Sequence, residues 1–203
     1  MKPRVKICGL TRADDVDLAI ALGATHVGFV LAKDSPRALV GDAARALAAR
    51  AANRAQPVLV FRRSSAEDIL ACVAQAAVRC VQLPATDEPT CIAVAAAGVR
   101  VHRVHTVEPG ESLPILRPLP SEHLPALLDV GDGGTGRCFD WSLLGATAPE
   151  HTFLAGGITP ENLPALLLHR PWGIDLSSGV ESAPGVKDHA RLRCLFAALE
   201  QYQ

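Results

Sequence analysis

The chain has 203 residues, of which 49% are hydrophobic and 20% charged, and its formal net charge is -1 at pH 7. This composition favours a folded protein over a disordered one, and the length predicts one domain, residues 1–203. The charged residues form no basic stripe, so we expect no nucleic-acid partner. The chain opens without a signal peptide and holds no apolar run long enough to cross a bilayer. We therefore expect no membrane partner and a cytoplasmic location.

Strand-like and helix-like segments alternate along the chain. Strand-like apolar runs cover 3–8, 26–31, 57–61, 79–83, 99–104, 126–130, 152–157 and 172–176. Helical patterns cover 13–23, 41–54, 65–77 and 88–97, followed by a short helix around Asp140, a helix from Pro160 and a last one from about Lys187. Residues 108–125 contain five prolines, so we expect a loop there in place of a regular fifth helix.

Eight strand–helix units in about 200 residues predict an α/β protein, a single (β/α)8 TIM barrel of minimal size. A doubly wound open sheet is the main alternative, but such a sheet more often stops at five or six strands. In a barrel, function belongs to the loops at the carboxyl ends of the strands.

The seventh and eighth strands end in glycine-rich and serine-rich loops. Gly156 and Gly157 follow the seventh strand, and Ser178 and Gly179 follow the eighth. Glycines expose backbone N–H groups, and these two loops form the common phosphate site of the barrel fold. The alternative is a plain turn at the glycines and a helix cap at Ser178. Together the two motifs favour a phosphorylated ligand.

The sixth strand ends in Asp129, before a glycine-rich loop at 131–136. A carboxylate in this place often caps a nearby backbone group. The functional alternative is a general acid or base at the barrel mouth, and Asp132 inside the loop is a less well positioned competitor.

The first strand ends in Cys8, followed by a glycine that lets the backbone turn. An isolated cysteine is more often structural than catalytic. A thiol can accept a proton if positive charge lowers its pKa from about 8.5, and Lys6 and Arg37 are the candidate charges. Lys6 has the parity of Cys8 on the strand but lies deeper. Arg37 also suits a carboxylate, which a guanidinium binds with two parallel hydrogen bonds. The remaining cysteines and the seven histidines show no metal-ligand spacing, so we expect no metal.

Several motifs together are specific. They are KICG with LTR (6–12), GFVLAKDSPR (28–37), VQL (81–83), LLD (127–129), GGTGRCFDW (133–141), LAGGITPENL (154–163) and DLSSGVESAPGVKD (175–188). In this order, and over almost the whole chain, the sequence resembles the phosphoribosylanthranilate isomerases of tryptophan biosynthesis.

The resemblance implies an isomerase that performs the Amadori rearrangement of N-(5-phosphoribosyl)anthranilate to 1-(2-carboxyphenylamino)-1-deoxyribulose 5-phosphate, without a cofactor. It implies that Asp129 is the general acid, Cys8 the general base, and Arg37 the ligand of the anthranilate carboxylate. Gly156, Gly157, Ser178 and Gly179 would hold the phosphate. Family members occur as monomers and homodimers, and both states stay open.

The sequence departs from the family pattern after VQL, where Pro84 and Ala85 replace the usual His-Gly. The contribution of the fourth loop is therefore open. Three alternatives also remain: a Schiff-base aldolase using Lys6, a dual-specificity isomerase, and a catalytically silent barrel that binds a phosphometabolite. Lys6 lies too deep for the first, and the second typically has an aspartate where this chain has Cys8.

Overall fold

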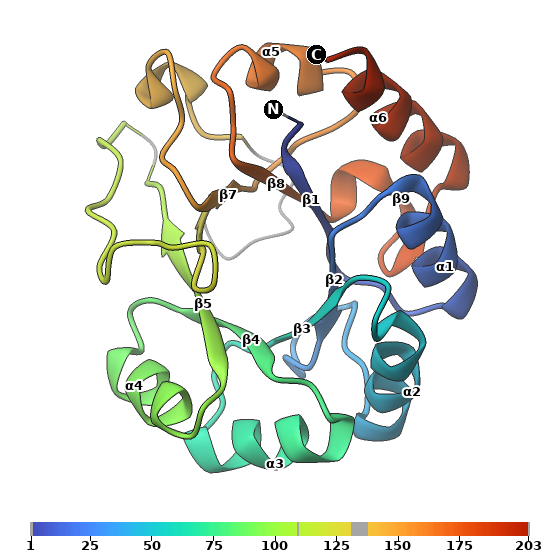
Figure 1. Cartoon of the computed structure of the whole chain (residues 1–203), viewed down its shortest axis with the longest axis vertical. Helices are drawn as coiled ribbons and strands as arrows, with labels where there is room; N and C mark the ends of the chain where they lie inside the picture. The colour runs from blue at the N-terminus through green and yellow to red at the C-terminus, as the bar shows by residue number, and fades with distance from the viewer. Residues whose placement is uncertain (1, 109, 131–137, 203) are drawn as a thin grey trace.

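The computed structural model describes residues 2–108, 110–130 and 138–202. Eight parallel strands form a closed barrel in chain order, with the helices around it (Figure 1). The strands are β1 (Arg4–Ile7), β2 (His26–Val30), β3 (Gln56–Val60), β4 (Cys80–Pro84), β5 (Arg100–Thr106), β6 (Ala126–Asp129), β7 (Thr152–Leu154) and β8 (Gly173–Leu176). The helices are α1 (Ala13–Leu22), α2 (Gly41–Ala51), α3 (Ala66–Ala76), α4 (Glu88–Ala96), α5 (Leu163–Leu167) and α6 (His189–Gln201), with 3₁₀ turns η1 (Trp141–Leu144) and η2 (Ser178–Val180). The predicted (β/α)8 barrel is confirmed.

The barrel closes where β1 pairs with β8. Lys6 is in register with Asp175 and Ile7 with Leu176, so the first and last strands place their carboxyl ends side by side. Most of the strands are short runs that are buried on both faces, as parallel strands covered by helices must be, whereas β5 is polar and only partly buried.

Side-chain caps fix where several helices begin. Ser65 accepts a hydrogen bond from the backbone N–H of Asp68 at the start of α3, and Asp188 accepts two at the start of α6. Such caps satisfy donors that the first helical turn leaves free. They anchor these helices directly after the loops that line the barrel mouth.

One side of the barrel lacks a helix, as the prolines predicted. Within the described part of residues 107–125, between β5 and β6, the chain forms no helix and runs as a long loop (Figure 1). Leu113 and Leu116 pack against the core from this loop, whereas Ile115 and Leu119 are exposed. A few apolar contacts from irregular chain therefore replace a helix face here.

The structure differs from the sequence prediction near the C-terminus. Residues Glu181–Ala183 (β9) and Val186–Lys187 (β10) form a small antiparallel sheet, and α6 begins only at His189. The two strands are too short to show a periodic pattern, which is why the sequence did not reveal them.

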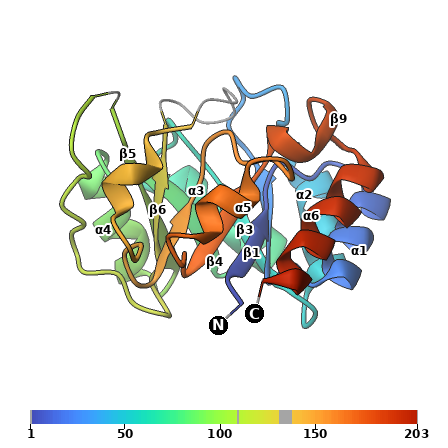
Figure 2. The same cartoon turned by 90° about the horizontal axis from the view of Figure 1, so that it is seen from above.

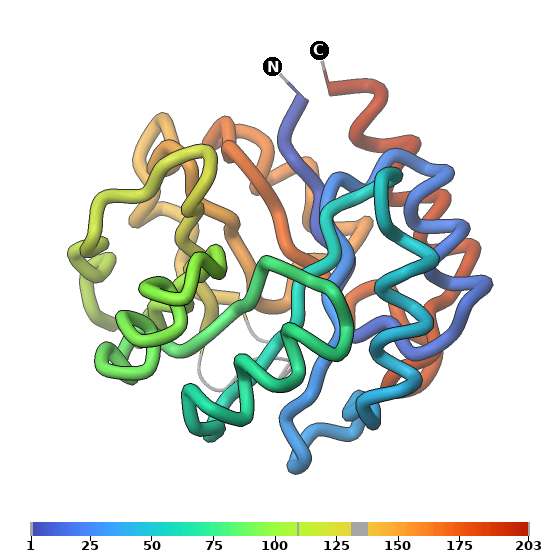
Figure 3. Tube along the Cα trace, turned by 60° about the horizontal axis from the view of Figure 1, so that its bottom comes forward, coloured from blue at the N-terminus to red at the C-terminus, as the bar shows by residue number. Residues whose placement is uncertain are grey.

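The two ends of the chain lie close together at one end of the barrel (Figures 2 and 3). Lys2 and Tyr202 line the same surface pocket there, at the amino ends of the strands. No helix in the described ranges is both long and apolar enough to cross a membrane.

Candidate active site

A pocket of about 700 Å³ opens at the carboxyl ends of the strands. Every residue that the sequence singled out as a site residue lines it: Cys8, Arg37, Asp129, Gly156, Gly157, Ser178 and Gly179. These residues come from five different strand ends, so only closure of the barrel brings them together.

Cys8 lies directly after β1, and its backbone N–H donates to the carbonyl of Leu176 on β8 (2.8 Å). Gly28 on β2 makes room for its side chain, because a Cβ atom at Gly28 would lie 2.7 Å from Cys8 Sγ. One pleat below, the Lys6 Nζ donates to Asp175 Oδ2 at 2.7 Å, and both side chains are buried. Cys8 thus stands at the floor of the pocket above a buried ion pair.

Burial raises the pKa of the Cys8 thiol above its ordinary value. The positive charges of Lys6 and Lys187 oppose this shift and Asp175 adds to it, but burial outweighs the lysines. The sequence left open whether neighbouring charge lowers this pKa. Burial therefore makes this thiol harder to ionise than a free cysteine.

Asp129 shows the shift that a general acid requires. Burial raises its pKa to about 6, partly opposed by a hydrogen bond from the Val130 backbone N–H to Oδ1 (2.8 Å). The carboxyl therefore caps a backbone group and lines the pocket as well. The glycine loop at 131–136, with Asp132, lies outside the described residues.

The loops after β7 and β8 touch each other where Gly179 meets Ile158. Gly156 and Gly157 have φ angles of 90° and 58°, which favour glycine. A Cβ atom at Gly179 would lie 1.8 Å from the carbonyl oxygen of Ile158, so no other residue fits there without moving the loops apart. Ser178 opens η2 beside this contact. The result is a backbone-lined recess of the kind that holds phosphate groups.

Arg37 reaches the pocket as predicted, but its guanidinium is already engaged. Its Nε and Nη2 donate to the two carboxylate oxygens of Glu181, at 2.9 and 2.7 Å. Lys187 donates to the same carboxylate at 2.8 Å and to the carbonyl of Ser177 at 3.1 Å. Although burial raises the pKa of Glu181, its hydrogen bonds and its charge contacts with Arg37 and Lys187 bring that pKa below its ordinary value. The role of Arg37 on a substrate carboxylate stays a prediction.

Sequence reasoning missed two parts of the site. The first is the Glu181–Lys187 arm, the hairpin of β9 and β10, whose Glu181 binds the guanidinium of Arg37. The second is the set of polar residues at the ends of β3 and β4, where Arg62, Arg63 and Gln82 line the wall. The charged pair Arg62-Arg63 directly after the apolar β3 was the available signal for the latter. Pro84 also lines this wall, so the fourth loop, whose contribution the sequence left open, does take part in the pocket.

The sequence matches the family described as N-(5'phosphoribosyl)anthranilate (PRA) isomerase over residues 5–198. The chain belongs to the phosphoribosylanthranilate isomerase family. The N-(5'-phosphoribosyl)anthranilate isomerase of Herminiimonas arsenicoxydans is 37% identical, covering 98% of this chain and 93% of that protein. The one from Methylibium petroleiphilum is also 37% identical, over 99% of this chain and 95% of that protein. The crystal structure of the phosphoribosyl anthranilate isomerase from Thermus thermophilus has a TM-score of 0.86 and 37% identity, with 98% of this chain and 100% of that one covered.

This membership confirms the activity that the motifs predicted. The chain is an isomerase of tryptophan biosynthesis that performs the Amadori rearrangement of N-(5'-phosphoribosyl)anthranilate. The comparisons support the reaction, whereas the roles of individual side chains stay predictions.

Proposed function

We propose that Asp129 and Cys8 are the general acid and the general base of this rearrangement. The observation that carries the proposal is their position: both line one pocket, from β6 and after β1, on either side of the recess after β7 and β8. A substrate whose phosphate occupies that recess presents its ribose ring between them.

The phosphate end of the substrate has a natural place in the recess formed by Gly156, Gly157, Ser178 and Gly179. A related structure, 30% identical with a TM-score of 0.81, is a complex with reduced 1-(o-carboxyphenylamino)-1-deoxyribulose 5-phosphate. That ligand has a phosphate at one end and a benzoate at the other. It supports a phosphorylated ligand for this chain too.

In the first step, protonated Asp129 gives its proton to the ribose ring oxygen. The C1–O bond breaks, and the nitrogen lone pair forms a C1–N double bond, which leaves an iminium cation. A pKa of about 6 suits this task, because the carboxyl keeps a protonated fraction near neutral pH and is still acidic enough to donate.

In the second step, the Cys8 thiolate removes the proton from C2. The electron pair of that C–H bond moves into the C1–C2 bond and neutralises the iminium nitrogen, which gives an enolamine. The enolamine then tautomerises to the ketone product. The cationic iminium lies close to Cys8 at this stage, and its charge favours the thiolate that burial disfavours.

Arg37 would hold the anthranilate carboxylate through the N–H groups that Glu181 leaves free. The remaining expectations belong to the same proposal. They are one catalytic domain spanning residues 1–203, a cytoplasmic location, a monomer or homodimer, and no nucleic-acid or membrane partner.

The test uses the loss of fluorescence of freshly generated phosphoribosylanthranilate. Cys8→Ser and Asp129→Asn should each lower kcat by about 10²-fold or more, the size of a lost acid–base contribution. Both variants should still bind the reduced product analogue, because neither forms the phosphate recess. Near-normal turnover in either variant would remove that residue from its proposed role.

The role of Arg37 is tested separately. Arg37→Ala should raise KM for the carboxylated substrate and change kcat less. An unchanged KM would contradict the proposed contact.

A further inference from the structure

Gln82 is a buried polar side chain of the pocket that the mechanism above does not use. It lies on β4 in register with Val60 on β3, and it lines the pocket with only 8% of its surface exposed. Among the described residues, none donates a hydrogen bond to its side-chain oxygen Oε1, although that atom is buried. A buried amide oxygen without a donor costs free energy, and native structures hold few of them. The carboxamide therefore suits a partner that arrives with the ligand.

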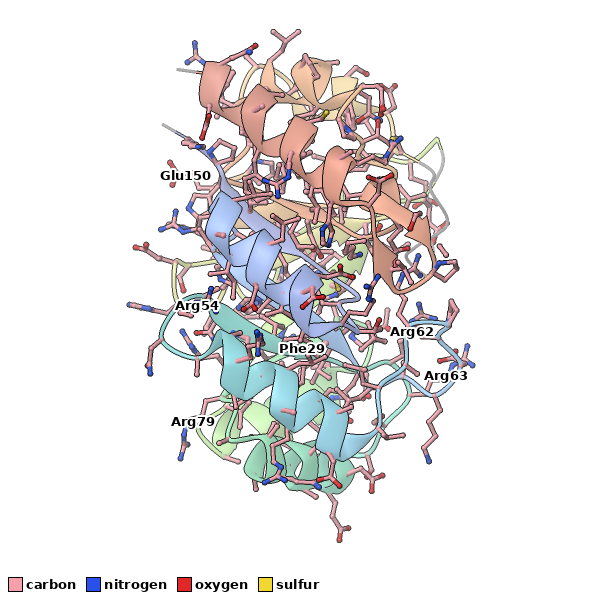
Figure 4. All side chains as sticks on the ribbon, turned by 90° about the vertical axis from the view of Figure 1, so that its right-hand side faces the viewer. Phe29, Arg54, Arg62, Arg63, Arg79 and Glu150 are labelled. Atoms are coloured by element: carbon pink, nitrogen blue, oxygen red, sulfur yellow. The ribbon has the colours of Figure 1, made fainter. Side chains whose placement is uncertain are left out.

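Gln82 lies deeper in the pocket than the cations of the same wall. Figure 4 shows Arg62 and Arg63 at one end of the barrel and Arg79 at the other. Arg62 and Arg63 line the mouth of the pocket, whereas Gln82 is level with Val60, two residues before Arg62. A neutral carboxamide beside a valine has no charge to offer the phosphate or the benzoate of the substrate. It suits an uncharged polar group that lies between those two ends.

The closed order of the strands indicates which group that is. β4 stands opposite β8 in the barrel, and the phosphate recess follows β7 and β8 (Figure 1). A substrate with its phosphate in the recess therefore extends toward β4, and C1 and C2, the ribose carbons far from the phosphate, come nearest to Gln82. Proton removal by Cys8 also places C2 over the floor of the pocket. The C2 oxygen is the uncharged polar group of the ribose in this place.

A hydroxyl at C2 matches the carboxamide of Gln82 in both directions. The hydroxyl donates to Oε1, and its oxygen accepts from the Nε2 amide group, whereas the anilino N–H next to it satisfies Oε1 alone. After the rearrangement C2 carries a ketone, and Nε2 can still donate to that oxygen. The amide does not titrate, so it holds the C2 oxygen before and after the reaction without adding a charge beside the acid and the base.

We propose that Gln82 is a specificity-determining residue that hydrogen-bonds the C2 oxygen of the ribose. This contact fixes C2 for proton removal by Cys8. The assignment rests on the orientation of the substrate in the proposed function.

The experiment measures binding by calorimetry with two ligands: the reduced product analogue, in which C2 carries a hydroxyl, and the same molecule with hydrogen in place of that hydroxyl. Gln82→Met keeps an unbranched side chain and removes the amide. It should weaken binding of the hydroxylated ligand by about 10-fold, the effect of one lost hydrogen bond. Binding of the deoxy ligand should not weaken, because that ligand has no C2 oxygen to lose.

Gln75→Met is the matched control, because Gln75 is an exposed glutamine on α3 outside the set of residues that line the pocket. It should leave both affinities unchanged. Unfolding in urea is measured in parallel, and Gln82→Met should not lower the free energy of unfolding, since it removes a buried oxygen that lacks a donor. The pH limbs of kcat/KM should also stay in place in Gln82→Met, because the amide carries no titrating proton.

Equal weakening of both ligands in Gln82→Met, or weakening of neither, would overturn the assignment while the acid–base roles of Cys8 and Asp129 stand. Failure of the wild-type protein to bind the hydroxylated analogue would overturn the proposed substrate orientation and this assignment with it.

Discussion

The opposite demands on Asp129 and Cys8 make the pH dependence of kcat/KM the most informative measurement. In the proposed mechanism, the active form needs Asp129 protonated and Cys8 ionised. Burial raises the pKa of Asp129 to about 6 and raises that of Cys8 above its ordinary value. The lower pKa therefore belongs to the group that must keep its proton, and the higher one to the group that must lose it.

The change of kcat/KM with pH differs between three ranges. Below 6, Asp129 is already protonated and the thiolate fraction falls tenfold per unit, so the rate falls. Between the two pKa values a gain in thiolate offsets the loss of protonated Asp129, and the rate is level. Above the pKa of Cys8 the rate falls again. On the plateau only a small fraction of the molecules has both groups in the active state, because the pKa of the group that must keep its proton lies below the pKa of the group that must lose it.

The assay records kcat/KM from pH 5 to 10, and we expect a broad bell with one limb near pH 6 and the other above the ordinary pKa of a cysteine thiol. The substrate phosphate also titrates near 6, so the Asp129 carboxyl is followed independently by carbon NMR and assigned by its loss in Asp129→Asn. Iodoacetamide labelling of Cys8 against pH gives the thiol directly. Mass spectrometry must resolve it, because Cys138 and Cys194 are exposed. Half-ionisation of Cys8 below pH 8, or of Asp129 below pH 5, would refute the reasoning.

Three substitutions test the supports of the site. Gly28→Ala forces a methyl group onto Cys8 Sγ, so kcat should fall by about 10²-fold, the effect of displacing a reacting group by about 1 Å. Circular dichroism should show that the barrel is still folded. An unchanged kcat would contradict the packing argument. Gly179→Ala separates the loops after β7 and β8, so inhibition by inorganic phosphate should weaken, and an unaltered inhibition constant would place the phosphate elsewhere. Asp175→Asn leaves the buried Lys6 ammonium without its partner and should lower the free energy of unfolding, measured in urea, by about 3–5 kcal/mol. The double variant with Lys6→Met should regain much of that free energy. If it regains none, the loss arises outside the ion pair.

The barrel could be predicted from the sequence because each strand is a separate apolar run bounded by turn or helix signals. The prolines of residues 108–125 likewise exclude a helix by local chemistry alone, since each removes a backbone donor. The hairpin of β9 and β10 could not be predicted in the same way. Its two strands are held by contacts with the rest of the protein, such as those of Lys187 with Asp15 and Ser177.

The site also has parts that local sequence predicts and parts that depend on residues far away in the chain. Cys8, Asp129 and the glycines stand at strand ends, and strand ends meet in any barrel, so their positions predicted that they line one pocket. The roles of Cys8 and Asp129 came from the resemblance to the family. The engagement of Arg37 with Glu181 joins residues 144 apart in the sequence, and the pairing of Lys6 with Asp175 joins residues 169 apart. Such partners depend on register and side-chain direction, which a single sequence does not specify.

The buried pair beneath Cys8 is best understood through its effect on the site. A buried ion pair stabilises a fold little, because desolvation of both charges offsets their attraction. Burial lowers the pKa of Lys6, but the charges of Asp175 and Cys8 raise it by more, so the ammonium stays charged inside the barrel. That charge lowers the pKa of Cys8 and so opposes the burial that keeps the thiol neutral, whereas the negative charge of Asp175 makes this lowering smaller. Burial therefore keeps the thiol protonated, while Lys6 provides a fixed positive charge for the thiolate. We infer that ionisation waits for the iminium of the bound substrate, so the base forms where and when its proton is available.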